Sequence, residues 1–199
     1  MLYIVGGLPL SFLLASAWTI AVISYFATRA TTGPRQRARL LRAVGVGLVI
    51  GLFATIAYDV TKAILAQLDP SPYNPFEVTR IFGQILIGTT APDAAITIVG
   101  WSFHLLNGCT FGVAFACLFA RSGRISRLRG WAYGLAWGLF LETMQLALYP
   151  GWLNTGFVDE FRRISFLSHI VFGTILGFFV PAGLRWVDRR RAASAGGFA

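Results

Sequence analysis

The sequence predicts an all-α integral membrane protein with five transmembrane helices, and three observations carry that prediction. The 199-residue chain is 56% hydrophobic and only 13% charged, with a mean hydropathy of +0.66, which is too apolar for a soluble domain whose surface must be solvated. Apolar runs long enough to cross a bilayer recur along it. Arginines cluster after alternate runs, as they do in the cytoplasmic loops of membrane proteins.

The apolar runs set the expected elements, which together form one membrane domain over residues 1–199. We expect spans at about 3–27, 43–68, 95–120, 130–148 and 165–186. No basic region precedes the first run, which favours an uncleaved helix over a signal peptide.

The connection between the second and third spans is too long for a simple turn. Asn74-Pro75-Phe76-Glu77 supplies an N-cap residue, a proline at the first helical position and an acid at the third. This predicts a surface helix at about 75–87, which is too short to span.

Arginine placement predicts the topology. The arginines of 29–42, 121–129 and 185–191 fall on one side of a five-span arrangement, and the intervening loops have no positive excess. The positive-inside rule then puts the N-terminus outside and the C-terminus in the cytoplasm, in a multi-pass protein of the cytoplasmic (inner) membrane. Anionic head groups explain the basic charge, so a nucleic-acid partner is not expected.

A motif with small residues at four-residue spacing occurs twice and contains both histidines of the chain. His-x3-Gly-x3-Gly is found at 104–112 and again at 169–177. The helix before each motif has a matching stripe that ends in a carboxylate, from Gly47 to Asp59 and from Gly130 to Glu142. Such GxxxG-like stripes let membrane helices approach closely.

The order of these residues, acid and then histidine in each hairpin, predicts a parallel pseudo-repeat. Helices two and three would form the first unit, helices four and five the second, and the surface helix would be an insertion in the first. A chance match in a glycine-rich chain is the alternative.

The four ionisable residues of the stripes are the candidate site. Asp59, His104, Glu142 and His169 are expected roughly 6 to 14 Å below the outer surface, given 1.5 Å per helical residue. Ionisable side chains inside a membrane are costly and suggest function. Two carboxylates and two imidazoles predict a site for Zn, Fe or Mn. The polar residues expected around it are Tyr58, Lys62, Asn107 and Gln145.

This constellation leads to an expected function and several alternatives. A metal-bound water at such a site could act on a lipid-like, membrane-soluble substrate entering from the outer leaflet. Alternatively, the two histidines would bind haem b, or the site would be a proton or cation relay of a transporter. A further alternative is a non-enzymatic accessory or scaffold subunit, in which Asp59 pairs with Lys62 and Glu142 with a histidine. Assembly as a homodimer or in a larger membrane complex stays open, as does catalysis itself.

Two stretches resemble known groups of membrane proteins. Glu142-Thr143-Met144-Gln145-Leu146, Tyr149-Pro150-Gly151, Asp159 and the helix with Gly173-x3-Gly177 resemble the final hairpin of VanZ-like proteins, over about a fifth of the chain. Trp152 stands where that family tends to have arginine, the outer loop is longer, and His169 replaces the usual asparagine. Tyr58-Asp59 followed by His104-x-x-Asn107-Gly108 also resembles a group of uncharacterised small multispan proteins. Either resemblance implies a role in the cell envelope.

Overall fold

The computed structural model describes residues 19, 31–121, 126–148 and 158–196. The predicted first span, 3–27, therefore lies almost wholly outside the described residues. Within them the only regular secondary structure is helix, the helices being joined by short connections such as 69–76 and 88–92, and no strand is formed, in agreement with the predicted all-α class.

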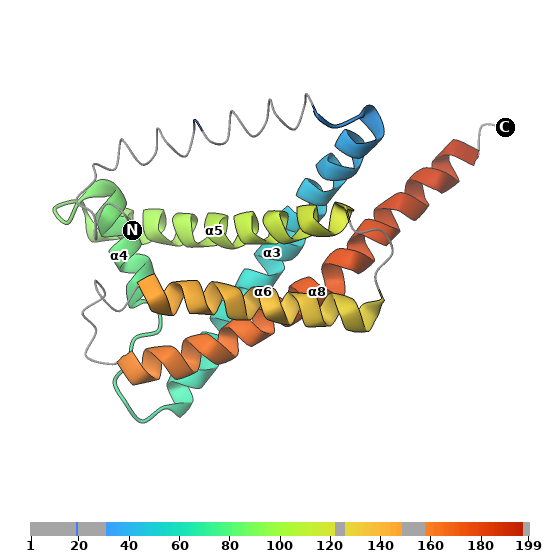
Figure 1. Cartoon of the computed structure of the whole chain (residues 1–199). Helices are drawn as coiled ribbons and strands as arrows, with labels where there is room; N and C mark the ends of the chain where they lie inside the picture. The colour runs from blue at the N-terminus through green and yellow to red at the C-terminus, as the bar shows by residue number, and fades with distance from the viewer. Residues whose placement is uncertain (1–18, 20–30, 122–125, 149–157, 197–199) are drawn as a thin grey trace.

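Five helices make up the described structure. They are α3 (Pro34–Leu68), α4 (Glu77–Ile87), α5 (Asp93–Arg121), α6 (Arg127–Leu148) and α8 (Val158–Gly196). In Figure 1, α3 and α6 run from right to left, whereas α5 and α8 run from left to right. Helix α4 lies at the left, where α3 and α6 finish and α5 and α8 begin, and we call this the α4 end of the bundle.

The ends of α3 and α4 at the α4 end agree with the sequence prediction, whereas α3 begins earlier than predicted and α8 exceeds its predicted span at both ends. The short helix expected at about 75–87 is present as α4. Its N-cap is Phe76 and not the predicted Asn74, whose Oδ1 accepts a hydrogen bond from the Phe76 backbone N–H at 3.0 Å just before the helix begins. Helix α3 begins nine residues earlier than the predicted 43, and α8 runs over 158–196 instead of 165–186. Arginine and alanine are strong helix formers, so the arginine-rich flanks continue the helices past the apolar runs.

Three of the helices are long and apolar enough to cross a membrane, namely α3, α5 and α8. Helix α6 was also predicted as a span, and its 22 residues are sufficient in length. The mean hydropathy of α6 stays below that of the other three helices. The reason is that α6 contains tryptophans, Tyr133, Glu142 and Gln145.

Close backbone contact at glycine joins the helices into two hairpins. Helix α3 packs on α5, and a Cβ atom added to Gly112 would lie 2.5 Å from Gly51 Cα. Helix α6 packs on α8, and a Cβ added to Gly134 would lie 2.5 Å from Gly177 Cα. Neither position has room for a side chain, so the predicted stripes are helix contacts.

The two seams match one another position by position. Gly51 faces Gly108 and Gly112 of the α5 stripe. In the other hairpin, Gly134 faces the equivalent positions of α8, Gly173 and Gly177. On α3, the next seam position toward the α4 end is Thr55, whose side chain contacts Gly108. The equivalent position on α6 is Gly138, which contacts the backbone of His169. One turn further along α3 and α6 come the two acids.

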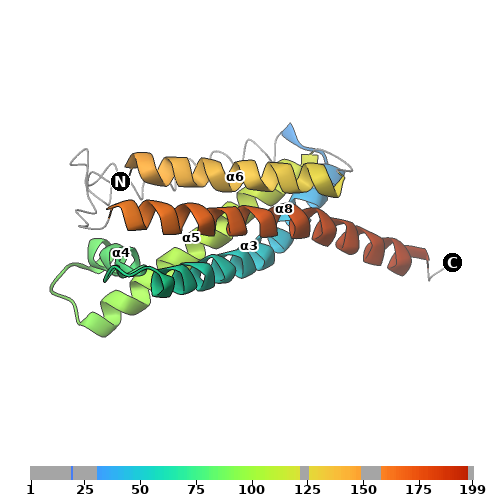
Figure 2. The same ribbon diagram turned by 90° about the horizontal axis from the view of Figure 1, so that it is seen from below.

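The hairpins associate unequally. Helix α3 packs closely against α8, whereas α5 and α6 share no such backbone seam in the described structure. Aromatic rings connect α5 and α6 away from the α4 end, through Phe115 with Trp137 and Phe119 with Tyr133. Figure 2 shows α6 and α8 side by side, and both views show the last turns of α8 projecting past the other helices.

We predict that alanine at Gly112 or Gly134 destabilises the protein, because its methyl group has no space in the seam. Overpacking of this kind costs about 1 to 3 kcal/mol. Gly45→Ala is the matched control, since a Cβ there meets no atom within 4 Å. Thermal unfolding of the purified protein in detergent would measure the difference, and equal midpoints for the three variants would contradict the tight seams.

Candidate functional site

Each hairpin holds one acid–histidine pair at the end of its glycine seam. In the first, His104 Nε2 lies 2.9 and 3.1 Å from the two carboxylate oxygens of Asp59. In the second, His169 Nδ1 lies 2.7 Å from Glu142 Oε2. Three of these residues are buried, and the His104 side chain is 18% exposed. The seams thus bring the predicted site residues together as two pairs.

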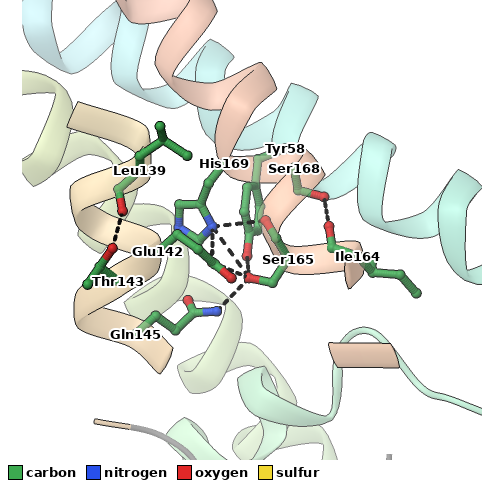
Figure 3. Close-up of polar contacts among 9 residues, drawn as sticks. All are labelled: Tyr58, Leu139, Glu142, Thr143, Gln145, Ile164, Ser165, Ser168 and His169. Carbon is green, nitrogen blue, oxygen red and sulfur yellow. Dashed lines mark hydrogen bonds and ion pairs between the residues drawn. The ribbon is translucent and has the colours of Figure 1, made fainter. Parts of the chain in front are cut away.

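The second pair lies within a hydrogen-bond network from three helices (Figure 3). The Ser165 hydroxyl donates to Glu142 Oε2 at 2.7 Å and accepts from the Gln145 side-chain amide at 2.7 Å. The Tyr58 hydroxyl, from α3, lies 3.5 Å from the same serine oxygen. Tyr58 and Gln145 were both expected near the site, and the structure places them there.

The contacts indicate which imidazole nitrogen carries a proton. His169 Nδ1 is near the Glu142 carboxylate and the Ser165 carbonyl, at 2.7 and 3.0 Å, and both of these only accept hydrogen bonds. Nδ1 is therefore protonated, which leaves Nε2 for other contacts. By the same reasoning, Nε2 of His104 is protonated because it faces the Asp59 carboxylate, and Nδ1 of His104 is left for other contacts.

The prediction of one four-ligand metal site is not supported. Among the described residues, no group of three or more His, Cys, Asp or Glu side chains is placed to hold a metal ion. The reason is that each carboxylate is used within its own hairpin, by the histidine across the seam. The alternative that Glu142 pairs with a histidine is confirmed. Asp59, however, binds His104 and not Lys62.

Lys62 is buried without a bonded counterion. It is 4% exposed, and among the described residues it forms no hydrogen bond or ion pair, although the charges of Asp59 and Glu142 act on it. Its ammonium group lies 5.4 Å from the ring centre of Tyr58 and 5.7 Å from that of Phe76. Such cation–π contacts offset part of the cost of burying the charge.

A cavity of about 250 Å³ lies between the two hairpins and is bounded by all five helices. Its polar lining contains the two histidines and every residue expected around them: Tyr58, Lys62, His104, Asn107, Gln145 and His169. Most of the wall is apolar and is formed by Val78, Phe82, Phe111, Phe140, Leu141, Met144, Phe161 and Phe172.

The cavity reaches the side of the described bundle. Phe140 and Met144 of α6 line it and are 49% and 40% exposed. Both residues belong to α6, which shares no close backbone seam with α5 in the described structure. A molecule approaching the side of the described bundle would therefore meet the cavity there.

Tyr73 and Phe161 belong to a small apolar cluster beside this cavity, with Val78 and Ile164. Burial, together with the carboxylates of Glu142 and Glu160, raises the pKa of Tyr73. Arg163 lies 3.1 Å from Asp69 and connects the start of α8 to the segment after α3. These contacts hold the first turn of α8 and the segment before α4 together at the α4 end.

Sequence reasoning missed Ser165, the centre of the second network. It precedes His169 by four residues, so it lies on the same helix face, and that spacing was a usable signal. It is fully buried and is not among the residues that line the cavity. Its hydroxyl lies near the same nitrogen that binds Glu142, at 3.4 Å, whereas a catalytic serine would need the opposite nitrogen. Ser165 therefore positions the pair and is not a nucleophile.

Comparison of the chain with models of protein families, with curated proteins and with solved structures found no match. The resemblance to VanZ-like proteins is thus untested. The chemistry of the site has to be argued from its own geometry.

We predict that double-mutant cycles recover the two pairs. Alanine variants of Glu142 and His169 should show a coupling energy of about 0.5 to 3 kcal/mol, as contacting residues do. Alanine variants of Asp59 and His104 should do the same. The cross-hairpin combination of Asp59 with His169 should add within about 0.5 kcal/mol. Thermal or denaturant unfolding measures all three cycles, and equal coupling in the cross combination would restore the single four-residue cluster.

Proposed function

We propose that this protein spans a membrane and binds a small membrane-soluble molecule in the cavity between its two hairpins. The observation that carries the proposal is the cavity of about 250 Å³, which both histidines, Lys62, Asn107 and Gln145 border. Ligand sites are mostly apolar hollows with a few convergent polar groups, and this cavity has that composition.

The exposed part of the cavity wall supports a ligand that arrives from the lipid. Phe140 and Met144 form that part, and both are apolar. In the predicted orientation the α4 end faces outward, so the ligand would enter from the outer leaflet of the inner membrane.

The acid–histidine pairs give the cavity acid–base groups with defined tautomers. Glu142 holds the Nδ1 proton of His169, so Nε2 is the nitrogen available for proton exchange with a ligand. This arrangement is suitable for general acid–base chemistry. The proposal is nevertheless one of binding, since no contact identifies a bond to be broken.

A scaffold or accessory subunit is the second candidate. The observation in its favour is that each acid pairs with a histidine of the same hairpin, at 2.9 and 2.7 Å, although Oε1 of Glu142 has no hydrogen-bond partner among the described residues. Such pairs also stabilise helix association in membranes. On this view the cavity would bind nothing specifically.

Haem b is not proposed. Tyr58 packs against both imidazoles, with ring centres 6.2 Å from His104 and 4.8 Å from His169. A porphyrin held between the two histidines would have to displace that ring.

We predict that filling the cavity abolishes binding of a copurifying membrane-soluble molecule. Met144→Trp places a larger side chain at the cavity wall and should remove the bound species from native mass spectra of detergent-purified protein. Ile64→Trp is the control, because Ile64 is 53% exposed and lies outside the cavity lining. Equal occupancy in both variants, or no bound species in the wild type, would favour the scaffold.

A further inference from the structure

We infer that the cavity selects an amphiphile with one hydrocarbon chain and a carboxylate head group, and that Lys62 binds the carboxylate. The inference rests on the proposed function and deepens it, because it names the ligand class and the residue that recognises it. Three observations carry it.

The first observation is the state of Lys62. A buried ammonium group normally has a hydrogen-bonded acceptor, because burial without one is costly. Lys62 is 4% exposed and borders the cavity, and the described residues offer it aromatic rings but no bonded acceptor. An oxygen atom of a ligand in the cavity would supply that acceptor.

The second observation is the balance of charge. Asp59 and Glu142, the carboxylates whose charges act on Lys62, are each bound to a histidine. Because each of these carboxylates is held by a histidine, neither is a directly bonded counterion of Lys62. A ligand carboxylate would supply that bonded counterion, and its single charge would be repelled less by Asp59 and Glu142 than the double charge of a phosphate.

The third observation comes from equivalent positions of the two hairpins. Lys62 lies three residues after Asp59, and its counterpart three residues after Glu142 is Gln145. Asn107 lies three residues after His104, and its counterpart after His169 is Phe172. All four line the cavity.

One side of a nearly symmetric cavity is thus charged and polar, while the other is largely apolar. A head group would lie against α3 and α5, and a chain would extend along α6 and α8. The chain would then pass Met144 and Phe140, where the wall reaches the side of the described bundle.

The size of the cavity limits the ligand. About 250 Å³ is below the range of roughly 300 to 1,000 Å³ that is usual for drug-sized ligands. The site therefore accommodates a head group and the first part of one chain, and not the two chains of a phospholipid.

The test compares two probes that differ only in head group. 11-Bromoundecanoate and 11-bromoundecanol have the same chain, and bromine quenches tryptophan fluorescence. Trp137 is a suitable reporter, because its ring lies 5.6 Å from that of Phe140, which lines the cavity on the side along which the chain extends. Binding would be titrated in nanodiscs of uncharged lipid, with empty nanodiscs as the reference for partitioning.

We expect the wild type to bind the carboxylate at least about tenfold more tightly than the alcohol, as a hydrogen bond to a charged group allows. Lys62→Met should abolish this preference without weakening the binding of the alcohol. Lys62→Gln is the second variant, since it introduces the residue found at the equivalent position of the other hairpin and retains a polar group. Thermal unfolding would establish that both variants are folded.

Arg80→Met is the matched control for charge. Arg80 is a cation of α4 that pairs with Asp93 at 2.8 Å and does not line the cavity. Its removal should leave the preference unchanged.

The possible outcomes separate the inference from the proposed function. Equal affinity for both probes in the wild type, tighter binding of the alcohol, or a preference that survives in Lys62→Met would overturn the role of Lys62, while cavity binding would stand. If neither probe binds saturably, the proposed function fails together with the inference.

Discussion

The structure depends on backbone-to-backbone contact between helices, which is available only where glycine removes the side chain. Gly51 with Gly112 and Gly134 with Gly177 are such contacts. Helices inside a membrane gain little from burying apolar side chains against each other, so in that setting close packing of this kind would hold them together. It also fixes the register, and that register brings each acid opposite a histidine.

The same constraint explains what the sequence could and could not predict. Four-residue spacing of small residues predicted the two seams, and the acid and histidine at their ends predicted where a polar site would lie. The spacing could not predict whether the four side chains form one cluster or two pairs. Side chains at one depth in a helix bundle are compatible with either arrangement. The choice depends on which hairpin each side chain faces, a distance across the bundle that spacing along a helix does not encode.

Other discrepancies have equally local causes. Lys62 lies three residues after Asp59, so an ion pair within α3 was reasonable, but His104 occupies the carboxylate from the other side of the seam. Ser165 was overlooked because a serine in an apolar helix has no charge to mark it. The predicted ends of α3 and α8 fall short of the observed ends, since hydropathy marks where an apolar run stops and not where helical hydrogen bonding stops.

The length of helix α8 has a mechanical consequence. Its 39 residues are continuous and, at 1.5 Å each, extend about 58 Å, which is roughly twice the hydrocarbon thickness of a bilayer. Pro181 is the internal residue that interrupts its hydrogen bonding, so it is the position at which this length can bend. His169 lies toward one end of this helix and Arg190, stacked on Trp186 at 4.3 Å, toward the other. A bend at Pro181, which lies between these two residues, would consequently move the arginine-rich end relative to the cavity.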